Sequence, residues 1–391
     1  MSIIENIALK RRVEVSLTGI NIATYTAAAI FLPYILSTLI LVSLSLYILM
    51  NKRTRQRIFS DTGSNILKLF FIYILAVPLF YRNWIGFATG IAVILAMILG
   101  LYLKSIMTRE LFEKILQLIC IFSLTSAGYA MIEKTVQLLD GGRSSHRIAA
   151  VFFHPNYFGT IVGTVVIICV YKLLTKQGHR WFYFMIAGFN IISMYLCKSM
   201  FVWVEVFIGV AVLLAVFKRH RLLTLWLIAA AAGGFLVLIL NVNIIPRLDD
   251  VEVTVRLRKQ IWELAVGQIA SAPLVGHGFY SFIYLFNRSY HNQIIPHSHN
   301  IYLDMLLNFG VIGTGLLLLY AARYYVSVIR VCWKEKNPII TSLIIAVTSA
   351  ALVHGATDIT LLWVQTLPLF LLVLSGIGAY EKKPRLYFRY R

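Results

Sequence analysis

A histidine-rich segment stands where a polar loop meets an apolar stretch. Residues 296–304 read Pro-His-Ser-His-Asn-Ile-Tyr-Leu-Asp, so His297 and His299 flank one serine and Asn300 and Tyr302 follow. A neutral imidazole at the edge of a membrane cavity suits the role of general base towards a hydroxyl group. A metal site is the alternative, but the neighbouring sequence supplies no dense set of carboxylates or cysteines to complete one. A helix cap is the plainer interpretation of either histidine alone.

A cationic segment lies upstream in the same polar loop. Arg256, Arg258 and Lys259 fall within four residues, and Trp262 follows them. Guanidinium groups suit phosphate oxygens because their planar fork makes paired hydrogen bonds and stays charged when partly desolvated. A solvated helix face, or a contact with anionic lipid headgroups, would explain the same pattern. Next to the histidine segment, these cations favour catalysis on an anionic substrate.

A third segment combines cations with a predicted helix start. Arg143 and Arg147 precede His154, Pro155 and Asn156. Proline is well tolerated in the first turn of a helix, and the free amides of that turn attract anions. A capped helix with interfacial aromatic residues is the alternative interpretation. The two arginines favour an anionic ligand.

Four other polar residues fall in or beside apolar stretches. Glu205 lies inside one of them, and an acid inside a membrane span is a functional candidate by default. We expect a structural pair instead, with Lys198 as the candidate partner. His354 and Asp358 lie at the last predicted turn on the same side as the histidine segment. They are candidates to support the site, although a polar hairpin tip is the simpler interpretation.

The composition excludes a soluble globular enzyme. Of the 391 residues, 59% are hydrophobic and only 13% are charged, against about 25% charged in ordinary soluble domains. The net charge of +20 could suggest a nucleic-acid partner. However, the basic residues form short clusters between apolar runs, as in loops at a cytoplasmic membrane surface. The four cysteines show no CxxC spacing, so neither a metal site nor a disulfide framework is indicated.

Apolar runs of about 20 residues predict about twelve membrane-spanning helices in a single integral membrane domain over residues 1–391. Basic clusters alternate with these runs and predict that both chain ends lie inside. The first run is expected to be an anchor, because no small-residue cleavage site follows it. The predicted spans lie near 14–32, 34–50, 64–81, 84–103, 111–132, 157–175, 181–197, 200–217, 222–242, 301–322, 338–355 and 359–379.

One long loop, at about 243–300, is predicted to lie on the outer face. Within it, residues 256–270 have helical apolar spacing, so an ordered and partly helical cap is expected. No internal repeat is visible, which weakens the picture of an inverted-repeat transporter. After the loop, Gly310, Gly313 and Gly315 are interpreted as close helix contacts.

Together these segments resemble the O-antigen ligase and polymerase superfamily of bacterial envelope enzymes. The similarity rests on Pro-Asn-x-x-Gly after an upstream arginine (147–159) and on Arg-x-x-x-Trp leading to Gly-x-Gly (258–278). It also rests on His-Ser-His-Asn-Ile-Tyr-Leu ending in Gly-x-x-Gly (297–313). The resemblance implies a multi-pass glycosyltransferase of the GT-C type, independent of metals and cofactors. Such an enzyme moves a whole glycan from undecaprenyl diphosphate to an acceptor hydroxyl on the outer face of the bacterial cytoplasmic membrane.

The resemblance also assigns roles to residues. It implies that His299 is the catalytic base and that Arg258 holds the diphosphate, assisted by Arg256 and Arg147. Supporting positions are His297, Asn300, Tyr302, His154 and Asn156.

One position departs from the family pattern. The family usually has an arginine after the serine that corresponds to Ser199, but this chain has Met200. Lys198 is the candidate replacement, although an ammonium group lacks the fork of a guanidinium. The second contact to the diphosphate is therefore in doubt.

Three functions stay open. The motifs do not distinguish a polymerase that joins repeat units from a ligase that attaches finished chains. A flippase for lipid-linked glycans would need charges along several spans, whereas Lys68 and Glu205 are the main charges within spans here. A structural subunit of an envelope complex is the third and weakest possibility.

Overall fold

The computed structural model describes residues 17–59, 63–141, 146–240, 251–286 and 295–381, and all regular structure in these ranges is helical. The predicted all-α class is therefore confirmed for this part of the chain. In chain order the helices are α2 (Leu17–Ala29), α3 (Tyr34–Met50), α4 (Lys52–Ile58), α5 (Ser64–Phe80), α6 (Trp84–Ile106), α7 (Arg109–Leu139), α8 (Pro155–Thr175), α9 (Arg180–Cys197), α10 (Met200–Val216), α11 (His220–Leu240), α12 (Val251–Ser271), α13 (Ser281–Leu285), α14 (Ile301–Ile329), the π-helical η2 (Arg330–Lys334), α15 (Pro338–Gly355), η3 (Thr360–Leu362), α16 (Thr366–Leu374) and η4 (Ser375–Ala379).

Several helices have the length and composition of membrane spans. Five of those described qualify, namely α6, α7, α8, α14 continued by η2, and α15. A sixth results if α3 and α4, which are bent by 97° at their junction, count as one span. The helices α5, α10, α16 with η4, and most of α11 are apolar but shorter. A multi-pass membrane protein is supported, whereas the expected count of about twelve spans is not confirmed.

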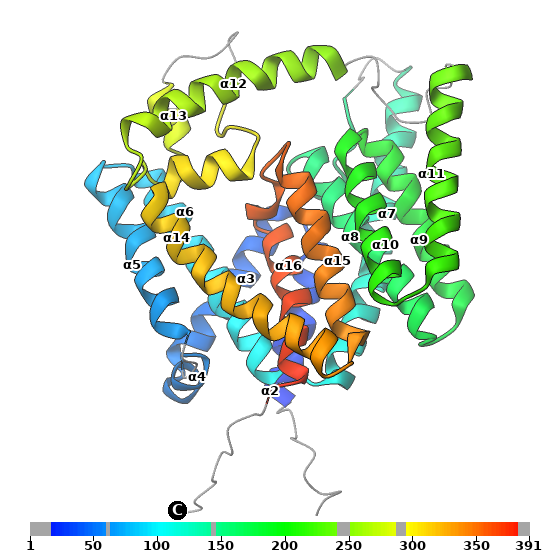
Figure 1. The fold of residues 1–391 in the computed structure, drawn as a ribbon, viewed down its shortest axis with the longest axis horizontal. Coiled ribbons are helices and arrows are strands. Elements are labelled where there is room, and N and C mark those ends of the chain that lie inside the picture. The colour runs from blue at the N-terminus through cyan, green and yellow to red at the C-terminus, as the bar shows by residue number, and fades with distance from the viewer. Residues whose placement is uncertain (1–16, 60–62, 142–145, 241–250, 287–294, 382–391) are drawn as a thin grey trace, which may run out of the picture.

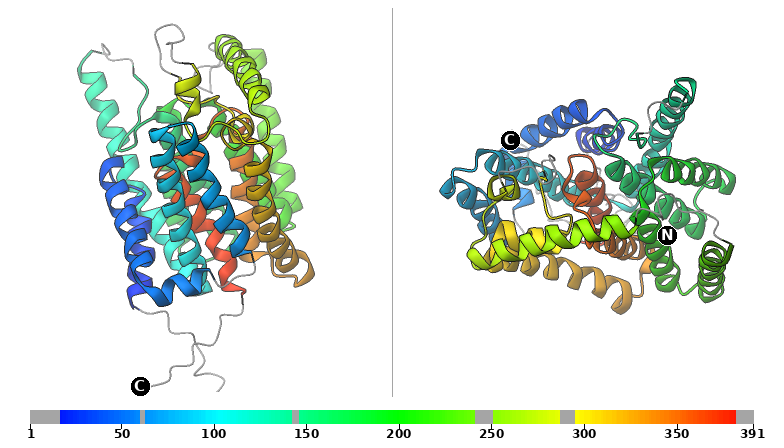
Figure 2. Two further views of the ribbon diagram at one scale, coloured as in Figure 1. Left: turned by 90° about the vertical axis from the view of Figure 1, so that its left-hand side faces the viewer. Right: turned by 90° about the horizontal axis from the view of Figure 1, so that it is seen from above.

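Most helices run side by side, and α12 lies across one end of the bundle (Figure 1). Seen from above, α12 crosses over the centre of the molecule (Figure 2). Ile261 and Ala265 on its apolar face are buried in a small cluster with Phe282 and Leu307. The helix predicted over residues 256–270 is therefore confirmed, as a helix that covers one end of the bundle.

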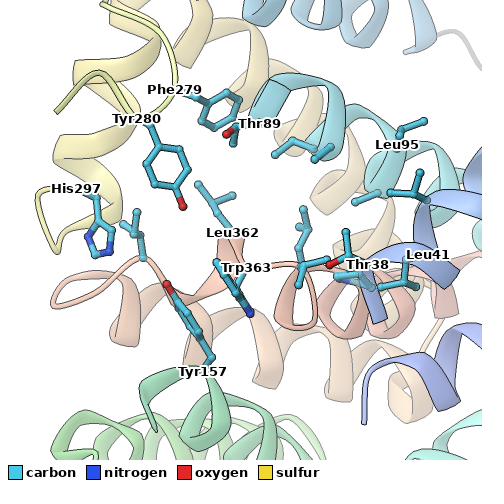
Figure 3. A pocket seen from close by; sticks show the side chains of 18 of the residues that line it. Thr38, Leu41, Thr89, Leu95, Tyr157, Phe279, Tyr280, His297, Leu362 and Trp363 are labelled. Atoms are coloured by element: carbon cyan, nitrogen blue, oxygen red, sulfur yellow. The ribbon is translucent and has the colours of Figure 1, made fainter. Parts of the chain in front are cut away.

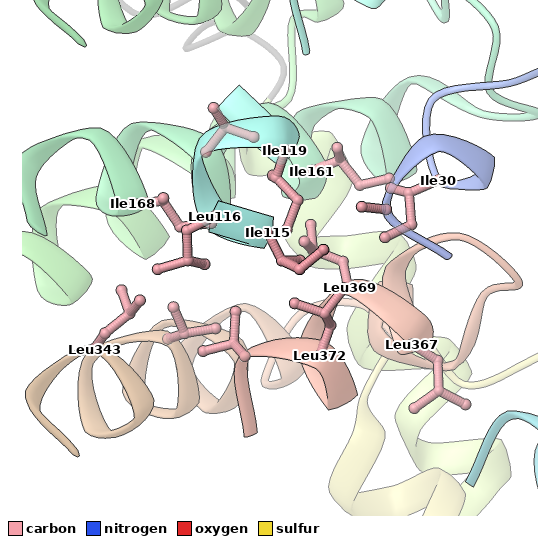
Figure 4. Packing of buried hydrophobic residues seen from close by; sticks show 14 of the residues in the cluster. Ile30, Ile115, Leu116, Ile119, Ile161, Ile168, Leu343, Leu367, Leu369 and Leu372 are labelled. Atoms are coloured by element: carbon pink, nitrogen blue, oxygen red, sulfur yellow. The ribbon is translucent and has the colours of Figure 1, made fainter. Parts of the chain in front are cut away.

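The main core forms where α7, α8, α15 and α16 meet. Figure 4 shows Ile115 and Ile119 of α7 facing Leu369 and Leu372 of α16, and all four side chains are almost completely buried. Close packing of small and branched side chains replaces the hydrophobic driving force that is missing between helices in lipid. This packing fixes the chain segments that carry the polar residues at the α12 end.

The chain after α12 is bound to a kink in α14. The backbone amides of His277 and Gly278 donate to the carbonyls of Leu307 and Asn308, both at 2.8 Å. Gly310 interrupts the helix with φ 58° and ψ −168°, and a Cβ there would lie 2.4 Å from the backbone of residue 274. Only glycine fits such a conformation and such an approach. The Gly-x-Gly segment thus binds the backbone of Leu307 and Asn308, just before the kink, and fixes the cap to the histidine-bearing helix.

The other two glycines of this group differ. A Cβ on Gly313 would lie 2.4 Å from the ring of Tyr73, so the expected close helix contact is confirmed there. A Cβ on Gly315 would meet nothing within 4 Å. The expectation of a close contact is therefore wrong for Gly315.

Candidate active site

His299 lies in the turn before α14 and is fixed by a carboxylate. Its Nδ1 lies 3.2 Å from Oδ1 of Asp358, and 32% of its side chain remains exposed. The backbone of His299 has φ 53°, a conformation that a non-glycine residue adopts only where the surroundings hold it. With Nδ1 used by the carboxylate, Nε2 is the ring nitrogen left for a substrate. This arrangement is typical of an imidazole base oriented by an acid.

Asp358 joins two helix ends. Its Oδ1 accepts from the backbone amide of Ile359 at 2.9 Å, and its Oδ2 accepts from Nδ2 of Asn156 at 2.6 Å. Burial acts to raise the pKa of Asp358, but the hydrogen bond and charge of His299 outweigh it and lower the pKa below its usual value. Asp358 is therefore a carboxylate anion able to stabilise a protonated His299.

Arg147 extends this network. Its Nη2 donates to Oδ1 of Asn156 at 2.6 Å, and its Nε donates to the carbonyl of Cys197 at 3.0 Å. Asn156 therefore receives one hydrogen bond from Arg147 and gives another to Asp358. The guanidinium adds positive charge beside the His299–Asp358 dyad, where a developing anion would be stabilised.

The rest of the histidine segment is rigidly built. Asn300 caps α14, accepting from the amides of Tyr302 and Leu303 at 3.0 and 3.1 Å, and its Nδ2 donates to the carbonyl of Ala356. The hydroxyl of Tyr302 donates to the carbonyl of Leu352 at 2.8 Å. Both side chains bind the start of α14 to the end of α15, and this holds the turn that carries His299 against the turn that carries Asp358.

His297 supports His299 directly. Its Nδ1 accepts from the backbone amide of His299 at 3.2 Å, and the two ring centroids lie 4.3 Å apart. Burial and then the nearby charge of His299 lower the pKa of His297 to about 3. A neutral ring next to His299 avoids repulsion when His299 takes up a proton.

His154 caps α8, which is the alternative interpretation of its position before Pro155. Its Nδ1 accepts from the amide of Asn156 at 3.2 Å, and Pro155 occupies the first helical turn. Burial and then the charge of Arg147 lower the pKa of His154. His154 thus orients Asn156, which in turn donates to Asp358.

The predicted cations fall into different positions. The guanidinium carbon of Arg258 lies 5.3 Å from the ring centroid of Phe201. Arg256 points elsewhere, since its Nη2 makes a 2.8 Å ion pair with Glu252 and 71% of its side chain is exposed. Lys198 ends α9 with φ 50° and an exposed side chain. Of these three cations, Arg258 contacts Phe201 at the start of α10. Phe201 directly follows Met200, the position at which the resemblance implies an arginine.

Glu205 has a different partner from the expected one. Its Oε2 lies 2.6 Å from Nδ1 of His354, and only 2% of each side chain is exposed. Pairing with Lys198 is therefore wrong, because the packing of α10 on α15 brings His354 to the acid while Lys198 caps α9 at the surface. The carbonyl of His354 accepts from the amide of Asp358 at 3.1 Å, so this buried pair supports the turn that carries the carboxylate.

Three groups of the site could also hold a metal ion. Ligand atoms of His297, His299 and Asp358 all lie within 4.8 Å of one another. Asp358 already accepts hydrogen bonds from His299, Asn156 and the amide of Ile359. A metal would have to displace at least one of these donors, so the residues fit the hydrogen-bonded network better. Independence from metals stays a prediction.

A cavity of about 220 Å³ opens beside the dyad. Figure 3 shows His297, Tyr157 and Tyr280 gathered at one end and Leu41 and Leu95 at the other. Tyr157 stacks on Trp363 with ring centroids 4.5 Å apart. Sequence patterns do not predict this cavity, because its walls come from α3, α6 and the loop before α16 as well as from the histidine segment.

Residues 158–318 match the family model described as O-antigen ligase. Over this segment, which is less than half of its length, the chain is similar to the O-antigen ligase family. The matched segment includes Lys198, Arg258, His297 and His299, and it stops before Asp358. A search of curated proteins finds no match. The resemblance noted in the sequence is therefore confirmed, and O-antigen ligase-type or polymerase-type glycan transfer is the general function of the family.

Proposed function

We propose that this chain transfers a glycan en bloc from undecaprenyl diphosphate to an acceptor hydroxyl. The observation that carries the proposal is the His299–Asp358 pair, which lies within a network that also holds Arg147. Glycan transfer of the kind that the matched family carries out needs a base for the hydroxyl and positive charge for the leaving group. Both are present at one end of the bundle.

The reaction follows from the roles of these groups. Nε2 of His299 accepts the proton of the acceptor hydroxyl as its oxygen attacks the anomeric carbon of the donor sugar. A new carbon–oxygen bond forms, the bond to the diphosphate breaks, and the diphosphate leaves with the bonding electrons. Asp358 stabilises the imidazolium that results, and Arg258 and Arg147 stabilise the negative charge on the leaving group.

The reaction takes place at one face of a single membrane domain. The site lies on the outer face of the bacterial cytoplasmic membrane. The basic loops lie at the opposite end of the bundle, and basic loops mark the cytoplasmic side. Residues 1–391 form one integral membrane domain, and α12 within the 243–300 loop covers the site. Arg256 and Lys198 are peripheral contacts for the donor, and no metal is required.

The acceptor decides between polymerase and ligase. Protein in liposomes with undecaprenyl-diphosphate oligosaccharide and no other acceptor will lengthen the lipid-linked glycan if the enzyme is a polymerase. A product that forms only with a separate acceptor identifies a ligase. Donor that becomes accessible across the bilayer with no new glycosidic product would instead support the transporter alternative, which neither the family match nor the described residues favour.

A further inference from the structure

Asp304 is a buried acid that the proposed reaction does not use. It lies in the first turn of α14, and only 4% of the residue is exposed. Its Oδ1 accepts from the backbone amide of Ser298 at 2.8 Å and also from the hydroxyl of Ser298. A buried carboxyl group is costly unless it is hydrogen-bonded, so these bonds explain how α14 can hold an acid there. They also bind the chain in front of the helix to the helix itself.

Ser298 is enclosed completely by its surroundings, with 0% of its surface exposed. Its hydroxyl also lies 3.0 Å from the carbonyl oxygen of Asn300, the residue that caps α14. The chain is therefore fixed at the residue before His299 and at the residue after it. Asp304 supplies the first of these two attachments.

The backbone of His299 needs such support. Its φ of 53° lies in the left-handed region, which a non-glycine residue keeps only where the surroundings hold it. Lys176 and Lys198 have similar φ values at the C-caps of α8 and α9, where this conformation commonly ends a helix. His299 instead precedes the N-cap of α14, so the end of a helix does not account for its conformation. The bonds from Ser298 to Asp304 do.

The direction of the imidazole depends on this backbone. Asp358 orients the ring through Nδ1 at 3.2 Å, whereas Ser298 and Asn300 fix the backbone from which the ring projects. Without the side chain of Asp304, the buried amide of Ser298 would lose its acceptor. An unsatisfied buried donor is costly, so the turn would relax. A shift of about 1 Å in a reacting group can lower a rate by about 10²-fold.

We propose that Asp304 is a positioning residue for His299: through Ser298 it holds the left-handed backbone that aims Nε2 at the acceptor hydroxyl. Two acids then have different tasks, since Asp358 orients the ring and Asp304 fixes the backbone that carries it. The inference rests on the proposed function, because it takes His299 as the base.

The kinetic test separates the hydrogen bond from the charge. Asp304→Ala removes the acceptor of Ser298 and should lower kcat for glycan transfer by about 10²-fold, with KM for the donor within about twofold of the wild type. Asp304→Asn keeps an Oδ1 acceptor and should recover kcat to within about tenfold of the wild type. Unchanged kcat in Asp304→Ala, or equal losses in the two variants, would overturn the positioning role.

A milder variant serves where Asp304→Ala does not insert into the membrane. Ser298→Ala removes only the hydroxyl and keeps the bond from the backbone amide to Asp304. It should lower kcat by about threefold to tenfold, as expected for the loss of one hydrogen bond. A kcat equal to that of the wild type would then overturn the proposal.

A second buried acid controls for loss of stability. Glu113 accepts from the hydroxyl of Tyr171 and from Nζ of Lys172, both at 2.5 Å. Lys172 lies near the opposite end of α8 from Asn156, so this cluster is far from the site. Glu113→Ala, or Glu113→Gln where the alanine variant does not insert, should lower the melting temperature and keep the kcat of the wild type. An equal loss of kcat in the Glu113 and Asp304 variants would show general destabilisation and overturn the proposal.

A spectroscopic test does not depend on turnover. Protein with ¹⁵N-labelled histidine in nanodiscs should show a downfield proton signal from the bond between His299 and Asp358, assigned by its loss in His299→Ala. The signal should persist in Asp304→Asn and disappear or broaden in Asp304→Ala. Full persistence in Asp304→Ala would overturn the positioning role. A wild-type protein whose signal depends on Asp304 in this way but that transfers no glycan would overturn the proposed function alone.

Discussion

Nδ1 of His299 lies 3.2 Å from Oδ1 of Asp358, although the two residues are 59 positions apart in the chain. The pair forms because Asn300 caps α14 and at the same time binds the turn after α15. The imidazole is therefore oriented by the packing of two helix ends.

Replacing the carboxylate tests this pair. Asp358→Asn keeps the size of the side chain, removes its charge and allows the wrong tautomer of His299. We expect kcat for glycan transfer to fall by about 10²–10⁴-fold, as for other oriented imidazole bases, with little change in KM for the donor. Asp140→Asn, at an exposed position after α7, is the control and should behave as the wild type. Unchanged kcat in Asp358→Asn would show that the pair is structural only.

The cations of α12 should differ in their effect on donor use. Arg258 lies over Phe201 at the start of α10, whereas Arg256 is bound to Glu252 and exposed. Arg258→Ala should raise KM for the diphosphate donor by about tenfold or more, and Arg258→Lys should recover only part of this because the fork is lost. Arg256→Ala should have a small effect that disappears at high salt. Equal effects of the two alanine variants would mean that the cap acts only through its overall charge.

How far the sequence predicted the site depends on the kind of residue. His299, Arg147 and Asn156 stood out because each lies in a short motif with chemical meaning. Asp358 is a candidate to support the site from its place at the last outer turn, but no local signal shows which distant side chain will meet it. The partner of Glu205 is not predictable from sequence, because Lys198 is near in the chain while His354 is near only through the packing of α10 on α15.

The fold was predictable in class and less so in detail. Apolar runs identify helices, and the helix in the 243–300 loop followed from its apolar spacing. The number of spans did not follow in the same way, because α5, α10 and α16 are shorter than a full span and α3 bends into α4. The kink at Gly310 depends on a backbone contact with residue 274, which hydrophobic periodicity does not reveal.

Gly310 should tolerate no side chain. Gly310→Ala places a Cβ at φ 58° and 2.4 Å from the backbone of residue 274, so we expect a loss of stability of about 1–3 kcal/mol and release of the chain between α12 and α13. Gly315→Ala has open space around its Cβ and should be neutral or slightly stabilising. Thermal unfolding in detergent compares the two variants. Equal melting temperatures would contradict the proposed docking of the cap.

The buried pair of Glu205 and His354 should position the dyad. Glu205→Ala leaves a buried imidazole without its partner, which costs about 3–5 kcal/mol for pairs of this kind. It should also lower kcat more than it changes KM, because the turn that carries Asp358 relaxes. Glu205→Gln keeps a hydrogen bond to Nδ1 and should recover most of both losses. If Glu205→Ala had a lower melting temperature but the full kcat of the wild type, the pair would stabilise the fold without positioning the site.

Acid should destabilise the protein partly through His297. Its pKa is lowered to about 3 in the folded chain, against an ordinary value of about 6.5. The unfolded chain therefore binds a proton first, and this contribution to stability is complete above about pH 6.5 and is lost as the pH falls towards 3. Between pH 7 and pH 4, the melting temperature of His297→Gln should fall by several degrees less than that of the wild type. Parallel curves for the two proteins would contradict a buried neutral His297.

The most direct test of the central claim is a single-turnover measurement of glycan transfer with His299 replaced. Wild type, His299→Ala and the control His146→Ala, whose side chain is 57% exposed, are placed in liposomes with undecaprenyl-diphosphate oligosaccharide and acceptor. We expect that His299→Ala still binds the donor but forms a new glycosidic bond at least about 10²-fold more slowly, while His146→Ala matches the wild type. Transfer by His299→Ala at the wild-type rate would show that His299 is not the base.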